Sequence, residues 1–339
     1  MDRETLLLTL LPLLRSALLG TPLEEEALES IRALEEKDWV ALLETAEQQT
    51  VSGLLYLAAE HFPEGISLPE SIYWELMKRV NLLANRSRRM AALESEILSM
   101  LSSAGLHPLV MKGSTCAARY PAPELRLAGD IDLYLPEGEL VPAVEVFHAA
   151  GIATQTSPDG SEVADKDGTT LELHGRYFDW HSSSPAAFPP VPSAEAELVM
   201  LSAHILKHAC GVGVGLRQIC DFCLAWQQYP GDRDALEALF RGLGLGKWNR
   251  LLLSFIQRYL DPSVRVRPVD PEPLLQIVLR GGNFGHFASG RQGSLSRSPL
   301  LRKADTALRL LARLPFALRY APREAPALLQ ELARGNLHS

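Results

Sequence analysis

The sequence is short of cysteine and of basic charge. Four cysteines in 339 residues are too few to indicate a disulfide-stabilised secreted domain, and reduced thiols in a cytoplasm are the simplest interpretation. Lysine and arginine number 33 against 41 aspartates and glutamates, which gives a formal net charge of -8. A chain with this charge has no overall electrostatic attraction for nucleic acid. We therefore expect a cytoplasmic protein without a nucleic-acid partner.

Long uninterrupted apolar runs are also lacking. The leucine-rich stretch at residues 6–20 is preceded by Asp2 and Glu4 and interrupted by Pro12 and Arg15. A signal peptide has a basic start and an unbroken apolar centre, and a membrane-spanning helix needs about 18 or more apolar residues. We expect this stretch to be an amphipathic helix packed on the body of the protein, and we expect no transmembrane segment.

The composition of the whole chain is that of an ordinary globular protein, with 47% apolar and 22% charged residues. The length is enough for two or three structural units. No internal repeat is evident, and a stretch rich in proline and serine marks a boundary near residue 190. We expect an N-terminal helical region over 1–75, a central core over 76–190 and a C-terminal helical region over 191–339.

Helical and strand patterns alternate along the chain. Apolar spacing predicts helices over residues 1–60, one long helix from Ser71 to about Leu101, and further helices beyond residue 193. Between them, short alternating or apolar runs predict strands at 107–111, 130–135 and 169–175, with a helix at 139–151. The fold class expected is α+β, with a small mixed β-sheet flanked by N- and C-terminal helical regions.

Three pieces of the predicted core carry the chemistry. Gly113 and Ser114 lie between a strand and a helix, where a phosphate can approach the backbone closely. Asp130 and Asp132 are two residues apart on a strand and therefore share a face. Glu172, on a later strand between two leucines, is a candidate third carboxylate.

Such carboxylates point to phosphoryl transfer. Neighbouring carboxylates repel each other unless a cation lies between them, and hard oxygen ligands suit Mg²⁺ or Mn²⁺. In phosphoryl transfer, these ions neutralise the triphosphate and help to align the reacting groups.

These motifs resemble the nucleotidyltransferases of the DNA polymerase β-like superfamily, and more closely a bacterial branch usually called the uncharacterised nucleotidyltransferase family. The resemblance covers roughly residues 75–260, although the spacer between Ser114 and Asp130 is longer than in the general superfamily pattern. The matching elements are Lys112-Gly113, Arg126, Asp130-Ile131-Asp132-Leu133, Glu172-Leu173-His174, His204 with His208, and Leu216-Arg217 with Asp221.

The resemblance implies a Mg²⁺- or Mn²⁺-dependent enzyme that transfers a nucleoside monophosphate from an NTP, for example ATP, and releases pyrophosphate. The acceptor expected is a hydroxyl of a peptide, a saccharide or another small molecule. Asp130, Asp132 and Glu172 are the expected catalytic and metal-binding residues. The expected nucleotide-binding residues are Lys112, Gly113, Ser114, Arg126, His174, His204, Lys207, His208, Arg217 and Asp221.

Alternatives remain open at several of these positions. Lys112 and Arg126 either bind phosphate or pair with the acidic cluster, and His174 contacts nucleotide or is a structural histidine. Instead of binding nucleotide, the two histidines of the first helix could form a zinc site with two cysteines of the next, the four ligands being His204, His208, Cys220 and Cys223. The basic stretch 291–320 is either a packed helix with a solvated arginine face or a surface for an anionic partner. The whole chain could also be a catalytically silent nucleotide- or partner-binding protein on the same fold.

Overall fold

The computed structural model describes residues 1–157, 159–178, 187–211, 213–281 and 313–327. Their helices and strands follow one another as α1 (Arg3–Leu19), α2 (Glu25–Arg32), α3 (Glu36–Gln48), α4 (Ser52–Glu60), α5 (Glu70–Ser103), β1 (Leu109–Val110), α6 (Ser114–Ala117), η1 (Pro123–Leu125), β2 (Asp130–Tyr134), α7 (Leu140–Ala149), β3 (Thr154–Thr156), β4 (Glu162–Lys166), β5 (Thr169–His174), α8 (Ala194–Cys210), α9 (Leu216–Gln227), α10 (Arg233–Gly242), α11 (Gly246–Tyr259) and α12 (Glu272–Gly281). This mixture confirms the predicted α+β class.

The chain forms two compact units. Unit 1 contains residues 1–80 and 180–339, and unit 2 contains residues 81–179. Helix α5 begins in unit 1 and continues in unit 2, which also holds the whole sheet. Each unit is described by itself below.

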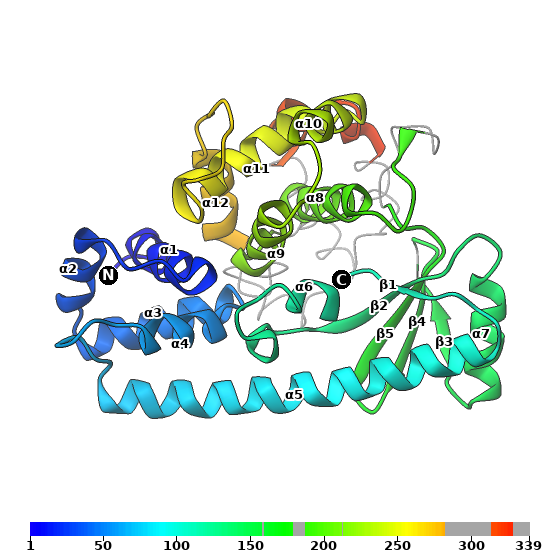
Figure 1. Cartoon of the computed structure of the whole chain (residues 1–339), viewed down its shortest axis with the longest axis horizontal. Coiled ribbons are helices and arrows are strands. Elements are labelled where there is room, and N and C mark those ends of the chain that lie inside the picture. Colours follow the sequence, from blue (N-terminus) through cyan, green and yellow to red (C-terminus); the bar gives the residue numbers. More distant parts are fainter. Residues whose placement is uncertain (158, 179–186, 212, 282–312, 328–339) are drawn as a thin grey trace, which may run out of the picture. The chain divides into compact units, whose positions relative to one another are not determined.

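The sheet of unit 2 has five strands in the order β1-β2-β5-β4-β3 (Figure 1). Strands β2 and β5 are parallel, and the other neighbouring pairs are antiparallel. The sheet is therefore mixed, as predicted. Its central parallel pair carries the Asp-x-Asp and Glu-Leu-His motifs side by side.

One face of the sheet is apolar and packs against helices. Side chains alternate across a strand, so the apolar residues of β2 and β5 point away from their acidic neighbours. They form a buried core with the unit 2 part of α5 and with α7, comprising Ile131, Leu133, Leu171, Leu173, Met90, Leu93, Ile97, Leu101, Ala143 and Phe147. Burial on this face sets the register, because a slip of one residue would turn the acidic side chains into the core.

Unit 1 is built from helices among its described residues. Helix α1 starts at the N-cap Asp2, whose carboxylate accepts a hydrogen bond from the backbone N–H of Thr5, and ends at Gly20 in the left-handed conformation. Its leucines are largely buried, and it packs against α3 and α4. The predicted N-terminal helix is thus a core helix. None of the helices that the structure describes is long and apolar enough to cross a membrane.

The basic C-terminal stretch falls partly outside the described residues. Residues 291–312 lie outside them, whereas residues 313–320 are helical. Ala317 and Tyr320 of this helix are buried, and Arg319 is exposed. The described part therefore has the arrangement of a packed helix with a solvated arginine.

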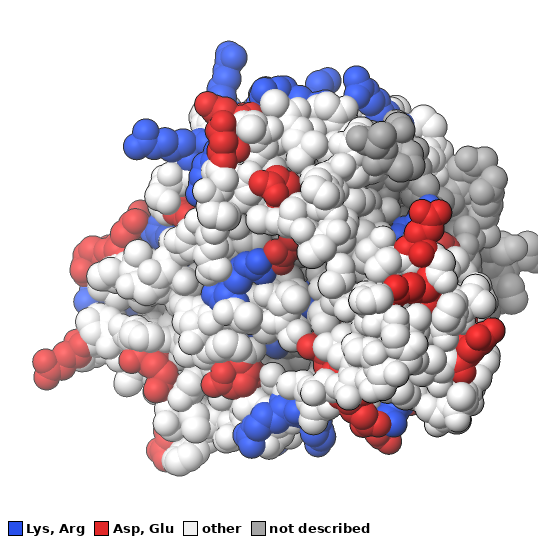
Figure 2. Space-filling model, turned by 45° about the vertical axis from the view of Figure 1, so that its right-hand side comes forward, with Lys and Arg blue, Asp and Glu red and all other residues white. Residues whose placement is uncertain are grey.

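Charged side chains are mixed on the surface. On the face shown in Figure 2, acidic and basic side chains are interspersed among the described residues. The net charge of -8 is therefore not gathered into one acidic area on that face.

Candidate functional site

The register of β2 and β5 brings the two acidic motifs together. Asp132 lies directly opposite Glu172, and two residues earlier on each strand Asp130 lies opposite Thr170. Because the strands are parallel and their side chains alternate, both carboxylates lie on the polar face of the sheet. Glu172, the candidate third carboxylate, therefore forms a direct cross-strand pair with Asp132.

Asp132 is the buried centre of this group. Its side chain is 3% exposed, and its Oδ1 atom lies 3.2 Å from Lys112 Nζ and 3.0 Å from His174 Nε2. Burial acts to raise the pKa of Asp132, but the charge of Lys112 and the hydrogen bond with His174 outweigh it and hold the pKa well below its usual range. Asp132 is therefore ionised at neutral pH.

Lys112 reaches the carboxylates from the end of β1. The backbone N–H of Met111 donates to the carbonyl of Asp132 at 3.0 Å, which extends the β1–β2 pairing and brings Lys112 alongside. Burial acts to lower the pKa of Lys112, but the carboxylates of Asp132, Asp130 and Glu172 outweigh burial, and its pKa is raised. A positive charge is thereby fixed beside Asp132.

Glu172 has a different environment from Asp132. Its side chain is 31% exposed, and its Oε2 atom lies 3.5 Å from His174 Nε2. Burial and the charges of Asp132 and Asp130 raise its pKa, with His174 and Lys112 opposing them. The two opposed carboxylates therefore differ in their readiness to hold a proton.

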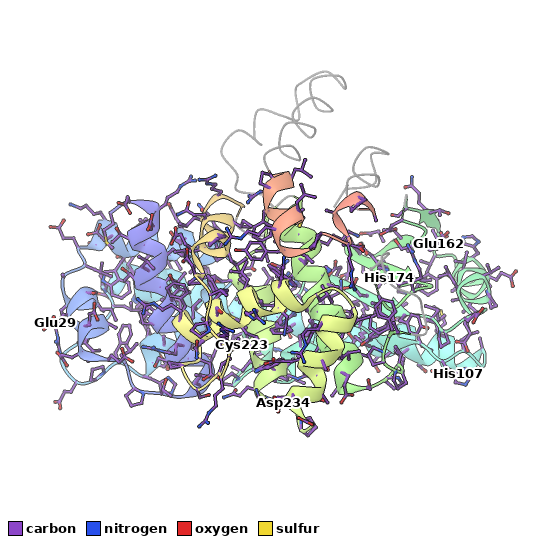
Figure 3. All side chains as sticks on the ribbon, turned by 90° about the horizontal axis from the view of Figure 1, so that it is seen from above. Glu29, His107, Glu162, His174, Cys223 and Asp234 are labelled. Atoms are coloured by element: carbon purple, nitrogen blue, oxygen red, sulfur yellow. The ribbon has the colours of Figure 1, made fainter. Side chains whose placement is uncertain are left out.

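Three side chains converge closely enough to hold one metal ion. Ligand atoms of Asp132, Glu172 and His174 all lie within 4.8 Å of one another, and within the described ranges this is the one such group of acidic, histidine and cysteine side chains. His174 is the last residue of β5, and its side chain is labelled in Figure 3. Asp130 is outside this compact group, although its charge acts on Lys112 and Glu172. The sequence left His174 open as a nucleotide contact or a structural histidine, and the structure places its ring beside the carboxylates of Asp132 and Glu172.

The Gly113-Ser114 turn follows β1 as predicted and opens α6. Gly113 has a φ of +67°, a conformation that side-chain-bearing residues rarely adopt. A Cβ atom there would meet only the carbonyl oxygen of Asp130, at 3.8 Å. The turn itself therefore requires glycine because of its backbone angles, whatever ligand approaches it.

Two contacts from α5 to this region were not anticipated from the sequence. The hydroxyl of Ser114 donates to Glu94 Oε1 at 2.6 Å, and Arg86 donates from its Nη2 atom to the carbonyl oxygen of Gly129 at 3.1 Å. The sequence predicts that Arg86 and Glu94 lie on one long helix. Only the tertiary fold shows which groups these two side chains contact.

Arg126 follows η1 and is buried, with 7% of its surface exposed. That Arg126 binds a phosphate, or alternatively forms an ion pair with the acidic cluster, stays a prediction.

The predicted helical residues belong to unit 1. His204, Lys207 and His208 lie on α8, and Arg217 and Asp221 lie on α9. The rings of His204 and His208 are edge-to-face, with centroids 4.4 Å apart, and His208, Arg217 and Asp221 are buried. Because the carboxylates belong to unit 2, a shared role for the two sets stays a prediction.

The alternative of a zinc site receives no support from the described residues. Cys220 and Cys223 are fully buried thiols on α9 that form no disulfide, and neither joins His204 or His208 in a group of described residues that could hold a metal. Both thiols are part of the buried core of α9.

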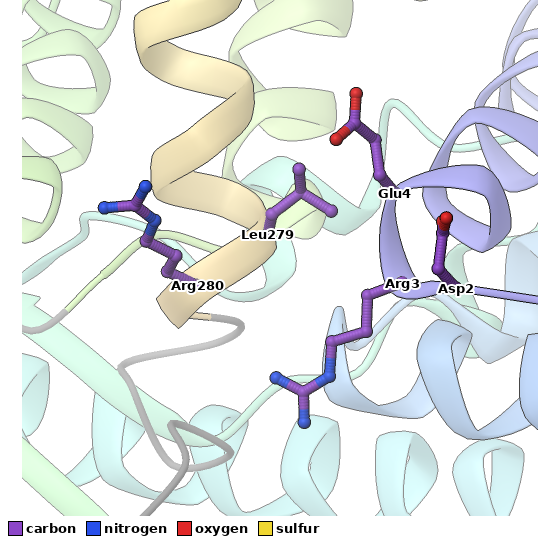
Figure 4. Close-up of a pocket in the computed structure, with 5 residues that line it drawn as sticks. All are labelled: Asp2, Arg3, Glu4, Leu279 and Arg280. Carbon is purple, nitrogen blue, oxygen red and sulfur yellow. The ribbon is translucent and has the colours of Figure 1, made fainter.

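A separate hollow of about 380 Å³ lies in unit 1. It is lined by the start of α1 and the end of α12, with Asp2, Arg3, Glu4, Leu279 and Arg280 around it (Figure 4). Acidic and basic side chains alternate there, and none of the carboxylate group takes part.

Comparison with known protein families gives one match. The family described as uncharacterised nucleotidyltransferase matches residues 35–261, well over half of the chain. The matched range includes the whole sheet and helices α8 and α9. Searches among curated proteins and solved structures gave no match.

Proposed function

The chain belongs to this family of uncharacterised nucleotidyltransferases, and from that premise we propose that it transfers a nucleoside monophosphate from an NTP to a hydroxyl acceptor, with release of pyrophosphate. Membership of the bacterial branch of the DNA polymerase β-like superfamily is part of the proposal. So is the acceptor class, a hydroxyl of a peptide, a saccharide or another small molecule. The observation that carries the proposal is the cross-strand pair of Asp132 and Glu172.

The side chains present fit a divalent metal ion. Asp132 and Glu172 supply oxygen ligands, which suit Mg²⁺ and Mn²⁺, and His174 lies close enough to join them. A bound divalent ion would neutralise the charge of the triphosphate at the reacting phosphate. An imidazole ligand suits Mn²⁺ better than Mg²⁺. If His174 instead donates its Nε2–H to Asp132, it orients that carboxylate as a supporting residue.

The neighbouring residues have roles that follow from their charges and positions. Lys112 carries a fixed positive charge beside Asp132 and would attract the negative triphosphate. The Gly113-Ser114 turn lies next to it in the chain, where the family motif implies contact with the phosphates. Asp130 lies on the same strand face as Asp132 and is proposed as a further metal-binding carboxylate.

The polar residues of α8 and α9 are proposed to bind the nucleotide or the acceptor. Support comes from the family motif, which pairs two histidines on one helix with an arginine and an aspartate on the next.

Pyrophosphate release tests the proposal. Each labelled NTP would be incubated with Mg²⁺ or Mn²⁺ and with pools of peptide and saccharide acceptors. We expect pyrophosphate from the parent chain and none from Asp132→Asn or Glu172→Gln. Glu162→Gln is the matched control, because Glu162 is a carboxylate of the same sheet on β4, outside the metal group. Turnover by Asp132→Asn would contradict the proposal, and nucleotide binding without turnover would favour a silent binding protein.

A further inference from the structure

Helix α5 places a carboxylate, that of Glu94, beside the Gly-Ser motif. This carboxylate is not part of the metal group. Glu94 is half-buried, whereas Ser114 is exposed, and the hydroxyl of Ser114 donates to Glu94 Oε1 at 2.6 Å. This distance lies in the range of O–H···O⁻ bonds to an ionised carboxylate, which are stronger than neutral ones. The exposed Ser114 of the Gly-Ser motif is therefore hydrogen-bonded to the half-buried carboxylate of Glu94.

We propose that Glu94 is a positioning residue for the phosphate-binding turn, acting through the hydroxyl of Ser114. The inference rests on the proposed function, in which this turn contacts the triphosphate. A free serine side chain samples several rotamers, and the bond to Glu94 selects one of them. The hydrogen bond to Glu94 thereby fixes the side chain of Ser114 at the start of α6, directly after Gly113.

The position of Glu94 argues against a purely electrostatic role. A carboxylate near a triphosphate repels it, so its charge alone would oppose substrate binding. Burial also raises the pKa of Glu94, with the Ser114 hydroxyl opposing this shift. What Glu94 supplies to the turn is therefore its hydrogen-bond acceptor.

Two substitutions separate the acceptor from the charge. Glu94→Gln removes the charge but keeps a carbonyl acceptor for Ser114, and Glu94→Ala removes both. Inorganic tripolyphosphate with Mg²⁺ is the probe, because every NTP shares its triphosphate, and calorimetry gives the Kd. We expect Glu94→Ala to bind the probe on the order of 2- to 10-fold more weakly than Glu94→Gln, the effect of one net hydrogen bond.

A double-mutant cycle shows whether Ser114 carries the effect. In a Ser114→Ala background, the difference between Ala and Gln at position 94 should vanish. Glu96→Ala and Glu96→Gln provide the matched control, since Glu96 lies on the same helix and pairs with Lys166 at 2.8 Å; we expect both to bind the probe as the parent does. Circular dichroism would confirm that each variant is folded.

The outcomes distinguish this inference from the proposed function. Equal binding by Glu94→Ala and Glu94→Gln overturns the positioning role alone, as does a difference that persists with alanine at position 114. If the parent chain itself does not bind the probe, the proposed phosphate site fails and the inference falls with it.

Discussion

Lys112 and His174 meet on the same oxygen of one buried carboxylate. Lys112 Nζ lies 3.2 Å and His174 Nε2 lies 3.0 Å from Asp132 Oδ1, although the three residues come from the end of β1, the end of β5 and the middle of β2. Asp132 thus has two protein partners on one oxygen before any ligand is considered, whereas Asp130, its companion in the motif, lies outside the compact group. The two aspartates should respond differently to substitution.

Asp132→Asn and Lys112→Met should each destabilise the fold, because each removes one member of the buried Lys112–Asp132 ion pair. Breaking a buried pair costs about 3–5 kcal/mol, and the 19% exposure of Lys112 reduces this figure. The double variant should recover part of the loss. Urea unfolding measures the free energies. The exposed pair Glu96–Lys166 is the control, where about 0–1 kcal/mol is expected; an equal effect at both pairs would contradict the buried-pair interpretation.

The strands that carry the chemistry were predictable, and their neighbours were not. Alternation of acidic and apolar residues in 130–135 and of polar and apolar residues in 169–175 correctly predicted β2 and β5. Strands β3 and β4 were missed, although Asp167 and Gly168 between β4 and β5 both have positive φ. An Asp-Gly pair between two extended runs is a strong hairpin signal, and it would have located β4.

Contacts between distant segments could not be read from the sequence. Spacing places residues on a face of one strand or helix, but it does not give the register between strands. The registers of β2 with β1 and β5 bring Lys112 and His174 onto Asp132. The bond from Ser114 to Glu94 likewise depends on where α5 packs, which is set by apolar residues elsewhere on that helix.

Glu94→Gln should stabilise the protein at neutral pH and not in acid. Burial raises the pKa of Glu94 in the folded state, so the folded chain holds this proton more tightly than the unfolded chain. The stabilisation that comes from this tighter proton binding is fully present below the unfolded pKa of roughly 4.3. It is lost as pH rises through the folded pKa of Glu94. Melting temperatures of parent and variant should differ at pH 7 and converge near pH 4. A gain that is the same at both values would contradict the prediction.

All four cysteines should resist thiol reagents in the folded protein. Each is buried and outside any disulfide. Burial raises the pKa of Cys210 to about 12, so almost no thiolate forms there near neutral pH. We expect a disulfide reagent at pH 8 to modify no thiol in the native chain and all four in guanidinium. Rapid reaction of Cys220 or Cys223 without denaturant would show that α9 is not packed as described. Elemental analysis would separately reveal any zinc.

The last prediction concerns Gln49, which connects three segments of unit 1. Its Oε1 atom accepts from the backbone N–H of Leu216 at 3.0 Å, and its Nε2 atom donates to the carbonyl of Val278 at 3.1 Å. Leu216 is the first residue of α9, and the first N–H groups of a helix have no partner within it. Gln49 is buried, so it supplies a hydrogen bond where water is excluded.

Gln49→Met keeps the side-chain length but removes both polar atoms. The N–H of Leu216 and the carbonyl of Val278 would then be buried without these bonds, at about 1–3 kcal/mol each, so we expect the free energy of unfolding to fall by about 2–6 kcal/mol. Gln48→Met is the control, because Gln48 is only half-buried. Hydrogen exchange should quicken at the start of α9. Since α9 carries Arg217, a proposed nucleotide contact, binding of Mg²⁺–NTP should weaken as well. If Gln49→Met is as stable as Gln48→Met, water replaces the lost bonds and Gln49 does not hold α9 in place.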